Sequence, residues 1–270
     1  MKEELRARGL RPRRSLGQHF LVDRSIADRV AALTVEGASA PRVLEVGAGT
    51  GVLTAALLSH GARVTAIEID ARLVAILRER EDLRGIDIIE GDALRYSFDE
   101  FAQGGPWMLA GNLPYNIGTP LVAEVARVPR PPSRMVVMLQ RDVIDRLVAK
   151  PSTPAYGSLT LIVGARMSVR RAFTIGRTHF YPQPNVDSSV AVLEPAAPAL
   201  PIENFELFDQ VVRAAFAYRR KTLANSLFRG MNVPRERTTA VLRTLGIDPE
   251  IRAEQLDITA FIKFAERIAG

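Results

Sequence analysis

The sequence predicts an α/β protein in which a mostly parallel sheet is followed by a small all-helical domain. From Arg42 to about Ala149, short apolar runs typical of buried strands alternate with segments of helical spacing. Such alternation indicates a parallel sheet with helices packed on it. Three prolines then fall within residues 195–201. This segment favours a linker, because proline continues neither a strand nor a helix interior.

We therefore expect a first domain over residues 1–194 that starts with a basic arm over 1–24, a linker over 195–201, and a helical domain over 202–270. Asp23 is expected to cap the first helix, over 24–35. The further strands are expected over 43–46, 63–69, 86–90, 108–111, 135–140, 157–166, 169–172 and 189–193. The further helices are expected over 52–59, 71–80, 119–127, 142–149, 205–228, 235–245 and 259–268, with Gly246 as a stop signal.

The composition excludes several classes of protein. Of 270 residues, 47% are hydrophobic and 24% are charged, which is an ordinary globular balance. No apolar run approaches the roughly 18 residues of a membrane span. The chain has no cysteine, which excludes disulfides, thiolate nucleophiles and cysteine-ligated metals. The N-terminus is basic without an apolar signal segment, so we expect a cytoplasmic protein.

The net charge of +6 is unevenly distributed. Residues 41–110 hold seven basic and eleven acidic residues, so the rest of the chain carries +10. This distribution suggests a small-molecule site with an anion-binding periphery. A solvated basic surface is the simpler alternative.

The most informative motif is the turn Gly47-Ala-Gly49-Thr-Gly51, which follows a predicted strand and precedes a predicted helix. Glycines at such a turn allow a ligand to approach the backbone closely. Glu68 follows Gly47 by 21 residues, at the spacing of a carboxylate that binds a ribose diol. The dinucleotide fingerprint requires Gly or Ala at position 52, where Val52 stands. These details favour S-adenosylmethionine over a nicotinamide cofactor.

Two further polar residues also fall at the ends of predicted strands. Asp92 follows the third strand and is placed to accept from the adenine amino group of the cofactor, although an aspartate there is also typical of a turn or cap. Asn112 follows the fourth strand. Ligands of open α/β sheets bind at the carboxyl ends of the strands, so we expect Gly47, Glu68, Asp92 and Asn112 to lie together.

The segment Asn112-Leu113-Pro114-Tyr115 suits methyl transfer to an exocyclic amine. An amide oxygen and a backbone carbonyl can accept both N–H bonds of the amine and so orient its lone pair. Pro114 stiffens the turn, and Tyr115 offers a stacking face for a base. Catalysis would then depend on positioning rather than on a charged base. A plain Asn–Pro turn with a packed tyrosine is the alternative.

The loop from Phe180 to Ser188 is rich in proline and aromatic residues. Phe180 is expected to cover the other face of a flipped base, although a loop phenylalanine is more often buried packing. Three consecutive cations, Arg219, Arg220 and Lys221, are candidates for contact with an RNA backbone, with a solvated helix face as the alternative.

The three histidines lack metal-ligand spacing, and no H-E-x-x-H, G-x-S-x-G or P-loop motif is present. We therefore expect no metal, and no hydrolase or P-loop chemistry.

As an ordered set, these motifs resemble the ribosomal RNA adenine dimethyltransferase family, and most closely its bacterial small-subunit members. The resemblance covers about residues 11–270 and includes Leu16-Gly-Gln-His-Phe-Leu21, Ala66–Asp70 and Arg219–Asn225. It implies a Rossmann-like S-adenosylmethionine-dependent methyltransferase domain with a small helical C-terminal domain that binds rRNA. The family often has Asn where His19 stands and Pro where Ala48 stands.

The resemblance also implies a substrate and a set of site residues. The substrate would be 16S rRNA in the assembling small ribosomal subunit, dimethylated at N6 of two adjacent adenosines near its 3′ end by a monomeric enzyme. Contacts to the cofactor are expected at His19, Leu21, Gly47, Gly49, Glu68, Asp92 and Asn112. Contacts to RNA are expected at Arg13, Arg14, Arg219, Arg220 and Lys221.

Three alternative functions remain open. The first is a non-catalytic factor for assembly of the small subunit. The second is a large-subunit rRNA adenine methyltransferase that gives antibiotic resistance, although such enzymes tend to have Ile where Leu113 stands and lack a close match to Phe180–Ser188. The third is a mitochondrial transcription factor of the same ancestry, which would need a presequence that is not evident here.

Overall fold

The computed structural model describes residues 10–197 and 200–269, and these form two compact units. The first unit contains the chain up to Ile144 together with Val169–Pro195, and the second contains Asp145–Ser168 together with the chain from Ala196 onward. The segment Asp145–Ser168 therefore separates from the continuous first domain expected over 1–194. Of the expected basic arm and linker, residues 1–9 and 198–199 lie outside the described residues.

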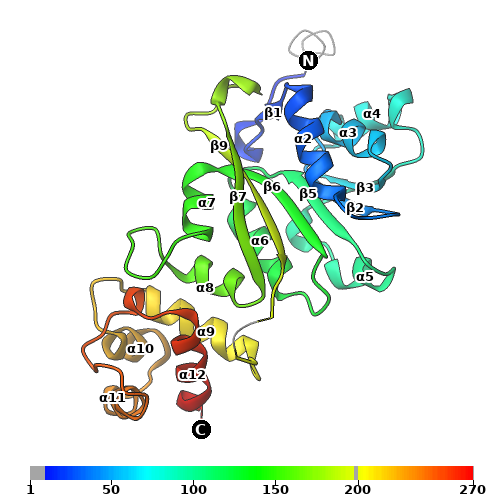
Figure 1. Cartoon of the computed structure of the whole chain (residues 1–270). Coiled ribbons are helices and arrows are strands. Elements are labelled where there is room, and N and C mark those ends of the chain that lie inside the picture. The colour runs from blue at the N-terminus through cyan, green and yellow to red at the C-terminus, as the bar shows by residue number, and fades with distance from the viewer. Residues whose placement is uncertain (1–9, 198–199, 270) are drawn as a thin grey trace. The chain divides into compact units, whose positions relative to one another are not determined.

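A seven-stranded sheet forms the centre of the first unit, in the order β4-β3-β2-β5-β6-β9-β7 (Figure 1). A separate two-stranded sheet pairs β1 with β8. The strands are β1 (Phe20–Leu21), β2 (Arg42–Val46), β3 (Arg63–Glu68), β4 (Asp87–Glu90), β5 (Met108–Asn112), β6 (Arg134–Gln140), β7 (Met167–Ile175), β8 (Phe180–Tyr181) and β9 (Ser188–Pro195).

The first five strands of the large sheet, from β4 to β6, are parallel, and β9 runs antiparallel to β6. The strand order reverses beside β2: the chain passes from β2 outward through β3 and β4, and then returns to β5 on the other side of β2. In an open α/β sheet, a ligand site forms at such a reversal, outside the carboxyl ends of the strands.

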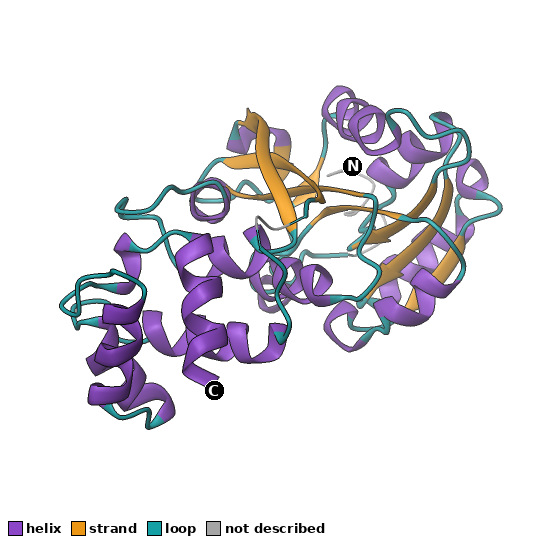
Figure 2. Cartoon of the chain, turned by 60° about the horizontal axis from the view of Figure 1, so that its bottom comes forward, coloured by secondary structure: helices purple, strands orange, loops and turns teal. Residues whose placement is uncertain are grey.

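Helices cover both faces of this sheet (Figure 2). They are α2 (Arg24–Val35), α3 (Val52–Ser59), α4 (Ala71–Glu79), α5 (Phe98–Gln103), α6 (Gly118–Arg127) and α7 (Arg141–Leu147). The Asp23 side chain accepts from the backbone N–H groups of Ser25 and Ile26, which confirms it as the cap of α2. Asp70 caps α4 in the same way. Each cap satisfies an N–H group that has no partner within its helix.

The second unit is helical. It contains α8 (Ser158–Gly164), α9 (Phe205–Phe216), α10 (Leu223–Met231), α11 (Arg235–Thr244) and α12 (Ile258–Ala269). The strand expected over 157–166 is wrong, because that segment is α8. Its apolar run is buried almost throughout, and a short run without periodicity does not distinguish a strand from a buried helix.

Packing explains why α8 and its flanks belong to the second unit. The Tyr156 hydroxyl donates to the carbonyl of Leu256 at 2.9 Å, and the Arg166 guanidinium lies 4.1 Å from the centre of the Phe205 ring. The helix expected over 205–228 is two helices, since the chain turns after α9 and Thr222 caps α10. Within the described part of the chain, no helix is long and apolar enough to cross a membrane.

The close approach of β2 and β5 gives a stability prediction. A Cβ atom on Gly111 of β5 would lie 2.6 Å from the Val46 carbonyl oxygen, and that backbone atom has no rotamer by which to move. We expect Gly111→Ala to destabilise the protein by about 1–3 kcal/mol and to lower Tm by roughly 3 °C or more. Gly91→Ala is the matched control, because nothing lies within 4 Å of its added Cβ. Equal Tm values for the two variants would contradict this packing.

Candidate active site

The glycine turn between β2 and α3 adopts a conformation that other residues rarely reach. Gly47, Gly49 and Gly51 have φ angles of 73°, 59° and 81°, in the left-handed region that favours glycine. A Cβ atom on Gly49 would also lie 3.1 Å from the Phe20 ring. The glycines therefore provide both the bend and the space at this turn, as the motif predicts.

Glu68 holds this turn from the end of β3. Its carboxylate accepts from the Gly49 N–H at 2.8 Å and from the Asp70 N–H at 3.0 Å, while the residue is only 5% exposed. Burial raises the pKa of Glu68, and these two backbone hydrogen bonds oppose the rise. Each carboxylate oxygen has a second lone pair, which is available to a ligand hydroxyl.

Two adjacent cavities of about 160 and 40 Å³ lie at the carboxyl ends of the parallel strands. Their linings share Leu16, Gly47, Glu68, Ile69 and Pro114. Asp92 lines the larger cavity and Asn112 the smaller one. The structure therefore brings together the four strand-end residues as expected. Asp92 also accepts from the Leu94 N–H at 2.9 Å, so it serves as a cap as well.

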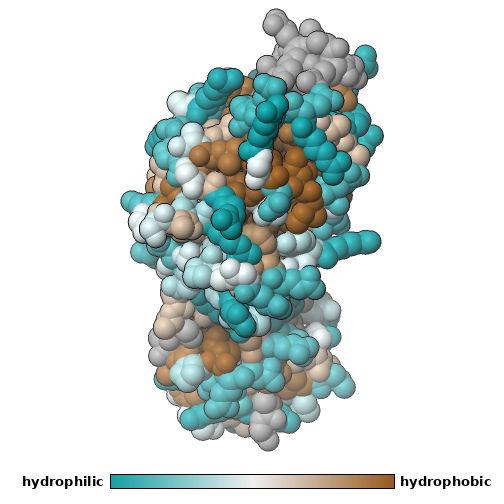
Figure 3. All heavy atoms as spheres, turned by 90° about the vertical axis from the view of Figure 1, so that its right-hand side faces the viewer, coloured by the Kyte–Doolittle hydropathy of each residue, from teal (hydrophilic) through white to brown (hydrophobic). Residues whose placement is uncertain are grey.

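These linings fit an adenosine-bearing cofactor. The turn at Gly47 leaves its backbone bare at the wall of both cavities, Glu68 supplies acceptors for hydroxyl groups, and Val46, Ile67 and Ile69 supply apolar surface for a base. Ile69 is 48% exposed and the neighbouring Leu94 39% exposed. On one face of the first unit, Figure 3 shows a hydrophobic patch surrounded by hydrophilic side chains.

Asn112 ends β5 with its side chain in a fixed orientation. Its Nδ2 donates to the backbone carbonyl of His19 at 2.7 Å. Among the described residues Oδ1 has no hydrogen-bond partner in the structure, so it is the acceptor that remains for a ligand. Pro114 lines both cavities, and Leu113, which is 1% exposed and part of the core, lines the smaller one.

Two contacts fix the Tyr115 side chain, one at its hydroxyl and one on the face of its ring. The hydroxyl lies 3.0 Å from Oγ of Ser188, and the ring stacks on the His19 ring with centroids 5.1 Å apart. Burial raises the pKa of Tyr115, and the Ser188 hydrogen bond opposes the rise. The tyrosine is therefore a neutral, rigid ring beside Asn112.

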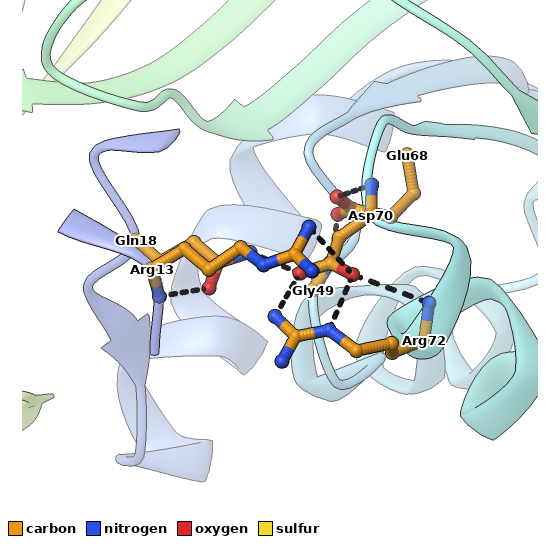
Figure 4. A network of polar contacts seen from close by, with 6 residues as sticks. All are labelled: Arg13, Gln18, Gly49, Glu68, Asp70 and Arg72. Carbon is orange, nitrogen blue, oxygen red and sulfur yellow. Dashed lines mark hydrogen bonds and ion pairs between the residues drawn. The ribbon is translucent and has the colours of Figure 1, made fainter. Parts of the chain in front are cut away.

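A polar network holds the N-terminal segment against the cofactor cavities (Figure 4). Gln18 Nε2 donates to Asp70 at 3.0 Å, and His19 Nδ1 donates to the Pro182 carbonyl at 2.7 Å. Leu21 is 5% exposed and its side chain packs in the core. Of the two residues expected to contact the cofactor from this segment, His19 lines the smaller cavity, whereas Leu21 lies in β1, which pairs with β8.

Phe180 differs from its expected role as an open stacking face. It lies in β8, is 4% exposed and packs in the same hydrophobic cluster as Leu21. Pairing with β1 turns this side chain into the core, so it supports the site from behind. The alternative of buried packing, open at the sequence level, describes it correctly.

Glu45 is a buried residue whose position before the glycine turn favours an S-adenosylmethionine site, but for which the sequence predicts no contact. It lies in β2, is 1% exposed, and its Oε2 has no hydrogen-bond partner among the described residues. Burial raises the pKa of Glu45 to about 7; the Thr54 hydroxyl and Arg80 lower it and the nearby Glu68 raises it further. The available signal was an acidic residue inside an apolar strand, two positions before Gly47.

The expected RNA-binding residues lie in both units. Arg13 and Arg14 are exposed in the first unit, and Arg220 and Lys221 are exposed in the second. Arg219 is already engaged within its unit, where Nη2 donates to the carbonyls of Pro154 at 2.9 Å and Tyr156 at 3.3 Å. Across the residues described, no three His, Cys, Asp or Glu side chains cluster as a metal site would require.

Comparison with known proteins gives consistent relatives. The sequence matches the ribosomal RNA adenine dimethylase family over residues 9–270. Ribosomal RNA small subunit methyltransferase A of Pelotomaculum thermopropionicum is 40% identical over 280 residues, which cover 98% of this chain and 94% of that protein.

Two crystal structures also match most of the chain. A dimethyladenosine transferase from Plasmodium falciparum matches with a TM-score of 0.75 at 27% identity, covering 91% of this chain and 96% of that chain. The 23S rRNA methyltransferase ErmE matches with a TM-score of 0.66 at 25% identity, covering 93% of this chain and 100% of that chain.

The buried carboxyl group of Glu45 predicts a pH-dependent stability difference. It keeps its proton to about pH 7 in the folded state and has an ordinary pKa of 4.5. The unfolded state therefore binds fewer protons between these values, and the stability of the native protein falls as pH rises from about 4.5 to 7. Glu45→Gln has no titrating group at this position. We therefore expect its free energy of unfolding to exceed that of the native protein by up to roughly 3 kcal/mol at pH 8.

Thermal unfolding of both proteins at pH 5 and pH 8 checks this difference. The gain should be small at pH 5 and large at pH 8. Glu90→Gln, at an exposed position on the same sheet, is the control and should show no such trend. A gain for Glu45→Gln that is equal at both pH values would refute the prediction.

Proposed function

Because the chain belongs to the ribosomal RNA adenine dimethylase family, we propose that it dimethylates N6 of two adjacent adenosines near the 3′ end of 16S rRNA in the assembling small subunit. The protein is an S-adenosylmethionine-dependent rRNA adenine dimethyltransferase. Its α/β fold class, with a Rossmann-like methyltransferase sheet and a helical C-terminal unit, is confirmed. The substrate within the small subunit is the part that we propose.

The observation that carries the proposal is the nearly full-length match to a small subunit methyltransferase at 40% identity. The 23S rRNA methyltransferase shares only 25% identity. Leu113 and the loop that ends at Ser188 also favour the small-subunit enzymes. Resistance enzymes of the family tend to have isoleucine in place of Leu113 and lack a close match to this loop.

The site suggests how the chain performs methyl transfer. The bound cofactor supplies a methyl group on a sulfonium sulfur. We assign Glu68 to the ribose hydroxyls, Asp92 to the adenine amino group, and the bare backbone at Gly47 and Gly49 to close contact with the cofactor. Leu16 and Ile69 exclude water from the same cavities. His19 lines the smaller cavity from the N-terminal segment, and Leu21 supports this segment from the core.

Asn112 and its loop position the acceptor. With Nδ2 fixed by the His19 carbonyl, Oδ1 can accept one N–H of the adenine amine, and a backbone carbonyl of residues 112–114 the other. The lone pair of N6 is then directed toward the methyl group, and Pro114 and Leu113 hold the loop rigid. Tyr115 stacks on the target base through the face that His19 does not occupy. Positioning of this kind supplies much of a barrier reduction without a charged base.

The basic residues suggest the mode of contact with the particle. Arg13 and Arg14 in the first unit, and Arg220 and Lys221 in the second, are exposed cations of the type that neutralises RNA phosphates. We propose a monomer in the cytoplasm that also assists subunit biogenesis, with methylation as the event that releases it.

Asn112→Ala tests the acceptor geometry. Loss of the amide oxygen should lower kcat by at least about a hundredfold, while the far-UV circular dichroism spectrum and the affinity for small subunits remain unchanged. The assay uses labelled S-adenosylmethionine with small subunits that lack the 3′-end modification, followed by mass spectrometry of the rRNA nucleosides. The native protein should give labelled N6,N6-dimethyladenosine at two adjacent positions.

Other outcomes of this assay identify the alternatives. Label in large-subunit rRNA, together with macrolide resistance on expression, would assign the chain to the resistance enzymes. Tight binding without label would assign it to non-catalytic assembly factors, and complementation of an assembly defect by Asn112→Ala would agree with that. Unchanged turnover of Asn112→Ala would refute the role of the loop.

Arg219 and Arg220 provide a matched pair for RNA binding. Arg220→Ala should weaken binding to small subunits and reduce the slope of log K against log salt by about 1, as expected for one lost phosphate contact. Arg219→Ala should instead lower Tm, because its hydrogen bonds within the second unit are lost. Binding by salt titration and thermal unfolding separate the two effects, and a reversed pattern would exchange the two roles.

A further inference from the structure

The network in Figure 4 joins the glycine turn and the end of β3 to the N-terminal segment, and its members Asp70 and Gln18 lie outside the methyl-transfer assignment above. We propose that Asp70 and Gln18 are positioning residues: Asp70 holds Gln18, Gln18 fixes His19, and His19 fixes the Asn112 amide and the Tyr115 ring. The proposal rests on the proposed cofactor and acceptor sites, and it adds the residues through which the geometry of one site depends on that of the other.

Asp70 is a rigid anchor. Its side chain is 1% exposed and accepts from the Arg72 backbone N–H at 3.2 Å and from Arg72 Nε at 2.9 Å. Arg13 Nη1 lies 3.9 Å away. The hydrogen bonds of Arg72 outweigh the desolvation of the carboxyl group, so the pKa of Asp70 is lowered to about 2. A carboxylate that is buried, charged and fully compensated has little freedom to move.

Gln18 is held at both ends of its amide. Nε2 donates to Asp70 at 3.0 Å, and Oε1 accepts from the Arg13 backbone N–H at 2.7 Å. The second bond closes the short turn over residues 13–18, in which Gly17 has a φ of 62°. Gln18 therefore fixes both the shape of this turn and its position above the end of β3.

This turn lies directly against the acceptor loop. A Cβ atom on Gly17 would be 2.8 Å from Asn116 Oδ1 and 3.2 Å from the Tyr115 backbone nitrogen. Leu16 lines both cavities on its other side. A displacement of the turn would therefore be felt at the cofactor and at the loop together.

His19 follows Gln18 and makes three contacts that fix its neighbours. Its backbone carbonyl accepts from Asn112 Nδ2, its ring stacks on Tyr115, and Nδ1 meets the Pro182 carbonyl. A carbonyl only accepts, so Nδ1 carries the proton and the ring orientation is set. Oδ1 and Nδ2 lie on opposite sides of the planar Asn112 amide group. Because the His19 carbonyl binds Nδ2, the position of His19 determines the position of Oδ1.

The test uses an exchange of hydrogen-bonding groups between the two residues. Gln18→Glu places a carboxylate against Asp70, and Asp70→Asn keeps an N-cap side chain while removing the charge. In the double variant Q18E/D70N, the amide introduced at position 70 donates to the carboxylate introduced at position 18, so the link to position 18 is restored with reversed polarity, while the bond from Arg72 Nη2 to Asp70 Oδ2 is lost as in Asp70→Asn alone. Gln103→Glu, at an exposed glutamine that ends α5, is the control for the added charge.

We expect Gln18→Glu to raise KM for S-adenosylmethionine and to lower kcat, each at least about tenfold, since small misplacements cost up to a hundredfold. The double variant should recover both parameters to within about threefold of the native protein, and Gln103→Glu should match the native protein. A merely structural link would lower Tm without this paired kinetic loss.

Native kinetics for Gln18→Glu, or losses in the double variant that equal the sum of the single losses, would overturn the proposal. Calorimetric binding of S-adenosylmethionine to Gln18→Glu and Glu68→Gln separates this failure from that of the proposed function. Loss of binding in Glu68→Gln alone would retain the cofactor site and reject the link. Native binding in Glu68→Gln would reject the cofactor site itself.

Discussion

Two buried carboxylates at the carboxyl end of β3, Glu68 and Asp70, are the constraint on which the site depends. Removing an ionised carboxylate from water is costly unless hydrogen bonds or opposite charges replace its hydration. Glu68 finds them in backbone N–H groups, one of which belongs to the glycine turn, and Asp70 finds them in Arg72 and Gln18. The compensation of these two charges therefore fixes the glycine turn on one side and the N-terminal segment on the other.

Much of this arrangement was predictable from sequence, because it depends on local chemistry with a defined period or spacing. Alternating strands and helices gave the sheet of the first unit, Asp23 identified a helix start, and Gly47, Glu68 and Asn112 fell at strand ends. A parallel sheet brings such ends together regardless of the distance along the chain. The cofactor class was likewise predictable, because Val52 breaks the dinucleotide fingerprint and Glu68 stands at the spacing of a carboxylate that binds a ribose diol.

The predictions failed where long-range packing decides the outcome. The buried apolar run of α8 carries no period, and its membership in the second unit depends on partners about 40 to 100 residues away in sequence, such as Phe205 and Leu256. The proline and aromatic residues of the Phe180–Ser188 loop predict a stacking role for Phe180, and only the pairing of β1 with β8 shows that this side chain faces inward. The role of Gln18 likewise depends on Asp70, 52 positions away.

The antiparallel direction of β9 has an architectural consequence. Its first residue, Ser188, pairs with Gln140, the last residue of β6. β9 therefore begins at the carboxyl end of β6, which is the end of the parallel strands that carries the site. The loop before β9 is thereby delivered to the site, whereas the chain after Pro195 leaves at the opposite edge. Changes of length in the loop over 182–187 would therefore reshape the acceptor pocket. This single reversed strand places a loop in which substrate preference can diverge at one end of the strands and the exit of the chain from the sheet at the other.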